Sequence, residues 1–375
     1  MDTVIVKPEI IKWAIERSGL PESRLNSKSF QTYFKWINGE KTPTLKALEI
    51  FSKKVFIPFG YLFFDKPIVE KLPISDFRSF GNKVLKPSLN LIDIIQKWIV
   101  RQEWFSRNIR NENSWMKFSN NFSVEDDTAD IAKSIRELLN LDSLNAKSFD
   151  DCSFRKQLSN SIEKLGILVV FSGTVDGNNS RPLDLNEFRG FSLYNEKTPL
   201  IFVNSKDSYK AQNFTIMHEF GHILLKQSGV TNSSPTNENK FELWCNKLAG
   251  QVLLPDFALK NKEFSEELID TLSETYNVSK LVVISRMYFC KLISWHKYHE
   301  LYENIKHEIK KYVQSKQKIN GGNYYTTKTL SLSTSFVDAV LFSTISGDTT
   351  YHEAYSLLNV KENTFKQYLI NRRFS

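Results

Sequence analysis

Cysteine is scarce in this sequence. The 375 residues include three, Cys152, Cys245 and Cys290, which are odd in number and far apart. No two of them form a C-x-x-C pair. This pattern excludes a disulfide framework and a cage of cysteine thiolates around a metal. It is typical of a chain that stays in a reducing compartment.

Long apolar runs are missing as well. No stretch approaches the roughly 18 apolar residues that span a bilayer. The opening residues, MDTVIVKPEIIKWAIERSGL, lack the basic-then-apolar pattern of a secretory signal. The sequence also shows no internal repeat and no low-complexity tract. We therefore expect a soluble cytoplasmic protein without a membrane partner.

Positive charge is in modest excess. The 50 Lys and Arg outnumber the 42 Asp and Glu, for a formal net charge of +8. A positive field would suit a nucleic acid or an acidic protein, because it raises the encounter rate with polyanions. Much of the excess lies in the segment IKHEIKKYVQSKQK, residues 305–318. Such a segment is more often the solvated face of a helix than a binding patch.

The length and composition, 41% hydrophobic and 25% charged, predict two or three domains. Residues 1–68 carry short helical patterns and predict a compact helical unit. A connector punctuated by prolines opens the largely helical stretch 69–149. Strand and helix patterns follow one another over residues 150–304, and residues 305–375 are mainly helical again. The predicted fold class is α+β.

The strand signals are three short runs, ILVVFSG, FRGFSLY and PLIFVNS, which are rich in β-branched and aromatic residues. One helix follows over residues 208–227, with Asp207 or Ser208 as its cap. A second helix, over about residues 238–254, ends before Pro255. This order predicts a small sheet just ahead of two helices.

The first of these helices contains FTIMHEFGHILL, residues 214–225, with two imidazoles and a carboxylate in an apolar run. Residues at i and i+4 share a helix face, so His218 and His222 can present two ring nitrogens to one ion about 2.0–2.1 Å away. Glu219 is offset by about 100° from His218 and can reach a metal-bound water without binding the ion. A zinc hydrolase with Glu219 as general base needs this arrangement. The alternative is a core helix whose two histidines are satisfied by hydrogen bonds.

A zinc site that keeps a position open for water needs a third protein ligand. Glu242 in ELWCNKLAGQVLLP is the best candidate, because it starts the helix expected to pack against the first one. Asn246, one turn further on, would face the same side and support a histidine by a hydrogen bond, with a simple packing contact as the alternative. The competing candidates for the third ligand are Glu238, Asp207, Cys245 and His296.

These two motifs and the run NEFRGFSLYNEKTPLIFVNSKDSYKAQNFTIMHEFGHILL resemble the ImmA/IrrE family of zinc-dependent metallopeptidases over roughly residues 150–300. The family pattern is a helix with H-E-x-x-H and a later E-x-x-A-N-x-F-A-x-x-L-L-x-P. The resemblance implies a zincin-like core, a small sheet plus active-site helices, within residues 150–304. It also implies Zn²⁺ held by His218, His222 and Glu242, with Glu219 as general base.

The sequence departs from the family pattern at three positions of the second motif. Cys245, Leu248 and Val252 stand where the family usually has Ala, Phe and Leu. All three are packing substitutions, so the implied catalytic residues are unaffected.

The flanking regions resemble family members less closely. Residues 1–68 are similar to the degenerate XRE-like helix-turn-helix found at the front of many such proteins. The segment SRLNSKSFQTYF, where a recognition helix is expected, has only Arg24 and Lys28 as basic residues. The unit therefore either binds DNA or serves as a structural or partner-docking module. The segment that begins NGGNYYTT resembles a tail of the family's longer members.

The resemblance implies limited proteolysis of a protein partner, often a helix-turn-helix repressor of a mobile element, a toxin–antitoxin system, a phage or a stress regulon. The alternative is a DNA- or protein-binding transcription regulator with a structural or vestigial zinc site. For an extended substrate, the strand PLIFVNS just before the metal helix is expected to offer an exposed edge that includes Ile201 and Val203. The cleaved segment would then be a loop or a locally melted helix.

Overall fold

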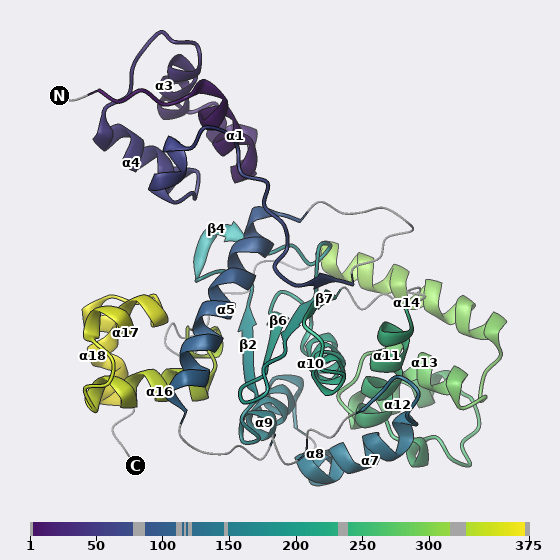
Figure 1. The fold of residues 1–375 in the computed structure, drawn as a ribbon. Coiled ribbons are helices and arrows are strands. Elements are labelled where there is room, and N and C mark those ends of the chain that lie inside the picture. Colours follow the sequence, from purple (N-terminus) through teal and green to yellow (C-terminus); the bar gives the residue numbers. More distant parts are fainter. Residues whose placement is uncertain are drawn as a thin grey trace. The chain divides into compact units, whose positions relative to one another are not determined.

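The computed structural model describes residues 3–77, 87–109, 115, 118, 122–145, 149–231, 239–315 and 328–371 (Figure 1). The chain divides into two compact units, one of Met1–Pro73 with Lys86–Asp93 and one of Ile74–Leu85 with Ile94–Ser375. The boundary predicted at 304/305 falls inside a helix of the second unit. The two compact units do not test the other predicted boundaries, so the four-part division stays a prediction.

The described part of the N-terminal unit is helical. Its elements are α1 (Pro8–Ser18), α2 (Glu22–Leu25), α3 (Lys28–Ile37), α4 (Leu45–Lys54) and the short 3-10 helix η1 (Phe59–Phe63). α1 begins with Pro8 in its first turn and ends at Gly19, whose φ of 59° is left-handed and favours glycine. Local sequence signals thus set both ends of this helix.

Aromatic side chains of α3 form much of the core of this unit. Phe30, Tyr33 and Trp36 recur every three residues, which places them on one helix face, and each is at most 5% exposed. The Tyr33 ring lies 4.7 Å from the ring of Phe51 in α4, centroid to centroid. Each large ring buries a large apolar area, so a few of them contribute strongly to so small a core.

A five-stranded mixed sheet lies in the second unit, with the strand order β1-β7-β5-β6-β2. The strands are β1 (Ser75–Asp76), β2 (Leu168–Ser172), β5 (Gly190–Leu193), β6 (Leu200–Asn204) and β7 (Gly229–Thr231). β5 runs antiparallel to both of its neighbours, whereas the β2–β6 and β1–β7 pairs are parallel. A separate hairpin consists of β3 (Thr174–Val175) and β4 (Asn178–Pro182).

The prediction that the strand before the metal helix offers an exposed edge is wrong. This strand is β6, and Ile201 pairs with Val169 on one side and Ser192 on the other. Both backbone edges are therefore bonded, and Ile201 and Val203 are fully buried. A strand that is apolar on both faces is typical of a sheet interior, which the run PLIFVNS already suggests by its lack of polar alternation.

α10 (Tyr209–Leu224) packs on the sheet and is flanked by α9 (Asp151–Glu163) and α11 (Lys240–Leu253) (Figure 1). Its cap is Ser208, whose side chain accepts a hydrogen bond from the backbone N–H of Ala211. Almost every residue of α10 from Gln212 onward is buried. The helix that carries the histidines is thus the centre of this unit, with neighbours on several sides.

The other described helices precede, separate or follow these elements in the chain. They are α5 (Leu89–Asn108), α7 (Thr128–Leu139), α8 (Leu141–Asn145), η2 (Asp256–Ala258), α12 (Glu266–Thr275), α13 (Lys280–Phe289), α14 (Trp295–Ser315), α16 (Thr334–Ile345), α17 (Tyr351–Leu358) and α18 (Glu362–Asn371). The architecture is α+β with helical flanks, as predicted. Across the described ranges, no helix is both long enough and apolar enough to cross a bilayer.

The C-terminal helices pack on α5. The Phe336 ring of α16 lies 5.7 Å from the Trp98 ring, and the Arg101 guanidinium donates a hydrogen bond to the Leu357 carbonyl at 2.9 Å. The segment NGGNYYTT, residues 320–327, lies outside the described residues. The mainly helical character predicted for the C-terminal region is thus confirmed where the chain is described.

Candidate metal centre

Two histidines of α10 converge on one point. His218 and His222 lie one helical turn apart, and neither is exposed to solvent. Their Nε2 atoms lie 3.1 Å from each other. The i, i+4 spacing produces this convergence, because it puts both rings on the same helix face.

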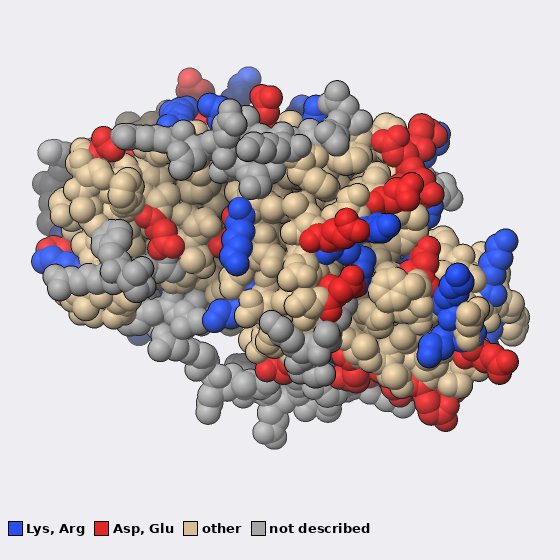
Figure 2. Space-filling model, turned by 90° about the horizontal axis from the view of Figure 1, so that it is seen from below, with Lys and Arg blue, Asp and Glu red and all other residues tan. Residues whose placement is uncertain are grey.

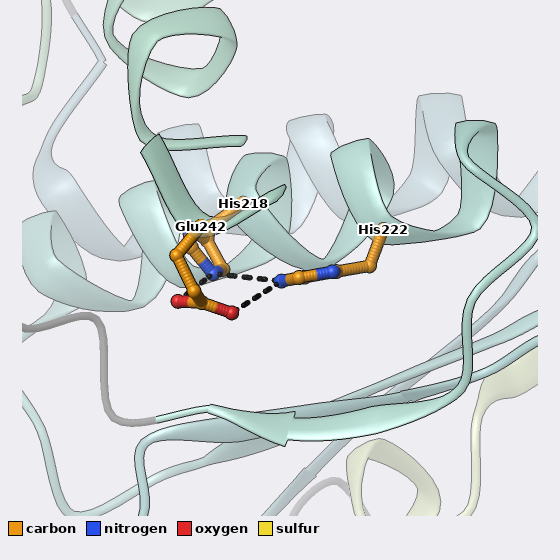
Figure 3. Close-up of side chains that lie close together, drawn as sticks. All are labelled: His218, His222 and Glu242. Carbon is orange, nitrogen blue, oxygen red and sulfur yellow. Dashed lines mark hydrogen bonds and ion pairs between the residues drawn. The ribbon is translucent and has the colours of Figure 1, made fainter. Parts of the chain in front are cut away.

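Glu242 of α11 completes the group (Figure 3). Its carboxylate oxygens lie 2.9 Å from His222 Nε2 and 3.4 Å from His218 Nε2. The two helices come close at Gly221, where an added Cβ would lie 3.1 Å from Cys245 Sγ and 3.3 Å from Cys245 Cα. The absence of a side chain at Gly221 thus lets α11 bring Glu242 to the histidines.

Amide side chains contact the other nitrogen of each ring. Asn246 Oδ1 lies 2.9 Å from His218 Nδ1, and Gln227 Oε1 lies 3.3 Å from His222 Nδ1. Because an amide oxygen only accepts hydrogen bonds, each contact places a hydrogen on Nδ1 and leaves Nε2 as the nitrogen that can bind a metal. Sequence reasoning proposed Asn246 and missed Gln227, which follows the end of α10 and lies in no motif.

The polar atoms of this group fit a metal ion. The two Nε2 atoms lie 3.1 Å apart, and both oxygens of Glu242 are buried beside them. Buried polar atoms without partners are costly, and a cation in contact with all three residues would satisfy them. Two imidazole nitrogens and one carboxylate form a ligand set typical of catalytic zinc sites.

The charge of Glu242 suits this role. Burial alone would raise the pKa of its carboxyl group, but positive charge on His218 and His222 and hydrogen bonds from these rings outweigh burial and hold the pKa at about 2. The carboxylate is therefore ionised at neutral pH, as a metal ligand must be.

Glu219 lies beside the group without belonging to it. Its Oε1 accepts a hydrogen bond from the Thr231 hydroxyl of β7, while its Oε2 is buried without a partner. Gly190 of β5 leaves space for the carboxylate, since a Cβ there would lie 2.9 Å from Glu219 Oε1. Burial raises the pKa of Glu219 to about 8, against the opposing effects of His222 and the Thr231 hydrogen bond.

The competing candidates for the third ligand are not part of the metal-binding group found among the described residues. Asp207 forms an ion pair with Arg189 instead. Cys245 packs against Gly221, and burial raises the pKa of its thiol well above the usual value, which disfavours the thiolate. His296 lies on α14 and is not among the residues of the group. Glu238 lies outside the described residues.

The fold and this site together define a metallopeptidase-like protein. Residues 162–288 match the family model described as the IrrE N-terminal-like domain, which supports the resemblance of this part of the chain to the ImmA/IrrE family. Residues 332–371 match a family described as a domain of unknown function (DUF8813). No curated protein and no solved structure matches the chain.

Proposed function

We propose that this protein is a zinc-dependent endopeptidase that makes a limited, regulatory cleavage in a protein partner. The observation that carries the proposal is the buried group of His218, His222 and Glu242 with Glu219 directly beside it. The family match over residues 162–288 supports the same class of protein.

The roles of the residues follow from their contacts. Zn²⁺ held by His218, His222 and Glu242 would supply Lewis-acid polarisation of the scissile carbonyl. The charge of a cation beside it would lower the pKa of Glu219, so that its carboxylate can take a proton from the attacking water and return it to the leaving amine. Thr231 orients the Glu219 carboxylate through Oε1, which leaves Oε2 for the water.

The partner that we propose is a helix-turn-helix repressor encoded near the gene, in a mobile element, toxin–antitoxin or stress system. The family resemblance motivates this choice, and the deep burial of the centre supports limited cleavage over bulk digestion, because few chain segments reach a buried site. Charge does not single out a nucleic-acid substrate. On the face in Figure 2, the coloured acidic and basic side chains lie intermixed, without one dominant basic area among the described residues.

For the N-terminal unit we propose protein docking, with DNA binding as the alternative. Phe34 of α3 and Leu45 and Ile50 of α4 are 41 to 47% exposed. Exposed apolar side chains favour a protein partner, because they gain free energy on leaving water. The lysines of α3, Lys28 and Lys35, are also exposed and could contact phosphates.

Incubation of the zinc-loaded full chain with the repressor encoded beside its gene tests the proposal. We expect one or a few cuts, mapped by mass spectrometry, that disappear in Glu219→Gln. The matched control is Glu274→Gln, which changes an exposed glutamate of α12 in the same way and should cleave normally. The proposal is contradicted if the repressor stays intact after incubation with the zinc-loaded wild type and with zinc-loaded Phe77→Ala, which lacks the ring stacked on His222.

A further inference from the structure

The metal centre is closed to solvent. His218, His222, Glu219 and Glu242 are all 0% exposed. A peptide bond must reach Glu219 and the three ligands before it can be cleaved. Part of the protein must therefore move away from this site before an endopeptidase of the proposed kind can act.

The segment from Ile74 to Phe77 pairs with a strand that contacts the site. That strand is β7, since Thr231 at its end donates a hydrogen bond to Glu219. Ser75 and Asp76 pair in parallel with Gly229 and Val230, and the Phe77 N–H donates to the Val230 carbonyl at 3.0 Å. This pairing occupies the backbone edge of β7 that faces away from β5.

The Phe77 ring covers a metal ligand. It lies parallel to the His222 ring, with an interplanar angle of 6° and 5.2 Å between centroids. It also lies over Gly229, where an added Cβ would collide with the ring. Gly229 does not have a left-handed φ, so its lack of a side chain serves this close approach rather than a backbone turn.

The segment is short and largely exposed. β1 has only two residues, Ser75 and Asp76, and both are exposed, while Phe77 is half-buried. Short edge strands open at low free-energy cost relative to the core. Ile74 directly follows Pro73, which belongs to the N-terminal unit. A partner that binds this unit can therefore pull on the segment through the backbone.

We propose that Ile74–Phe77 is an internal strand that occupies the place of the substrate on β7 and keeps the metal centre closed. An extended segment of the partner replaces it, pairs with the same edge of β7, and reaches the centre once the Phe77 ring has left His222. The proposal rests on the proposed function and deepens it. In this proposal the substrate pairs with the edge of β7 and not with β6, and this edge becomes free only when Ile74–Phe77 leaves it.

Two variants remove the cover in different ways. Phe77→Ala deletes the ring that lies on His222. Gly229→Ala keeps Phe77 but adds a methyl group where the ring lies, so the ring must shift. The control is Phe342→Ala, which deletes an equal ring at a position of α16 that is 61% exposed. Thermal unfolding of all three variants checks that the core stays folded.

The first measurement is the rate at which a chelator extracts zinc from the loaded full chain, which requires no peptidase activity. We expect both variants to lose zinc about tenfold faster than the wild type, because the open state becomes more populated. Phe342→Ala should match the wild type. In Gly229→Ala the Phe77 amide should also exchange hydrogen faster, since it loses its bond to Val230.

The second measurement adds the segment back as a peptide, KLPISDF, residues 71–77. We expect it to slow zinc extraction from Phe77→Ala, whereas a scrambled peptide of equal composition should have no effect. Unchanged extraction and exchange rates in both folded variants would overturn the proposal. If extraction accelerates and the peptide reverses it, yet the opened variants leave the repressor intact, then the internal strand stands and the proposed peptidase function fails.

Discussion

Asn246 Oδ1 lies 2.9 Å from Nδ1 of His218, although the two residues are 28 positions apart and belong to different helices. The contact holds the hydrogen of the ring on Nδ1 and directs Nε2 toward His222 and Glu242. The packing of α10 on α11 therefore sets both the position and the tautomer of a proposed metal ligand.

We expect Asn246→Ala to weaken zinc binding by about 10–100-fold, because His218 loses the acceptor that fixes its tautomer and orientation. Competition with a chromogenic chelator would measure the affinity. Asn186→Ala, in the exposed turn before β5, is the matched control and should bind zinc as the wild type does. Equal affinities of Asn246→Ala and the control would show that the contact is only packing.

Glu219→Gln should retain one zinc per chain and lose hydrolysis by roughly 10²–10⁴-fold, because Glu219 is the proposed base and not a ligand. The amide has the same shape and can still accept the hydrogen bond from Thr231. Elemental analysis gives the stoichiometry, and cleavage of the repressor gives the rate. Loss of zinc from the variant, or cleavage at the wild-type rate, would assign Glu219 another role.

Gly190→Ala should slow cleavage and destabilise the fold by roughly 1–3 kcal/mol, because the new Cβ overpacks the site. It would lie 2.6 Å from Thr215 Cγ2 and 2.9 Å from Glu219 Oε1. Gly60→Ala is the control, since a Cβ at Gly60 meets nothing within 4 Å. Urea unfolding and kcat measure the two effects. If both variants behave like the wild type, the space at Gly190 is not needed for the carboxylate.

Asp176→Asn should reduce stability at neutral pH by about 3 kcal/mol, because it leaves the buried guanidinium of Arg101 without its carboxylate at 2.9 Å. Asn tolerates the left-handed φ of 53° at this turn. Burial raises the pKa of Asp176, but Arg101 and Lys97 outweigh it and lower the pKa from 3.8 to about 2.

The same carboxylate predicts an acid dependence. A folded-state pKa below the unfolded value means that the contribution of Asp176 is fully present above about pH 4 and is lost as the pH falls toward about 2. Urea unfolding at several pH values should therefore show a steeper acid loss in the wild type than in Asp176→Asn. Parallel curves would contradict the assigned ion pair.

For the N-terminal unit we expect little binding to promoter DNA at any salt concentration, because its exposed side chains favour a protein partner. Binding measured from low to physiological salt would decide the matter. Tight binding at low salt that weakens steeply with added salt would instead indicate phosphate contacts and counterion release, and the DNA-binding alternative would replace docking.

The sequence by itself determined the local features of this protein. The spacing of His218 and His222 places both rings on one helix face, since 3.6 residues complete a turn. The runs that predict β2, β5 and β6 are long enough to show strand composition. Asn38 and Gly39 mark a turn after α3, and Pro255 ends α11. Such signals depend only on neighbours within a few residues, so a single sequence is enough to recognise them.

Only the tertiary structure decided which strand lies at an edge and what covers the metal centre. β6 follows β5 in the chain but is bonded on both sides, and β1 reaches β7 from more than a hundred residues away in sequence. Gln227 and Phe77 meet His222 through that same long-range packing. Strand order and ring contacts depend on pairing between segments that are far apart in sequence. Segments of two or three residues are too short to carry a periodic signal from which this pairing could be predicted.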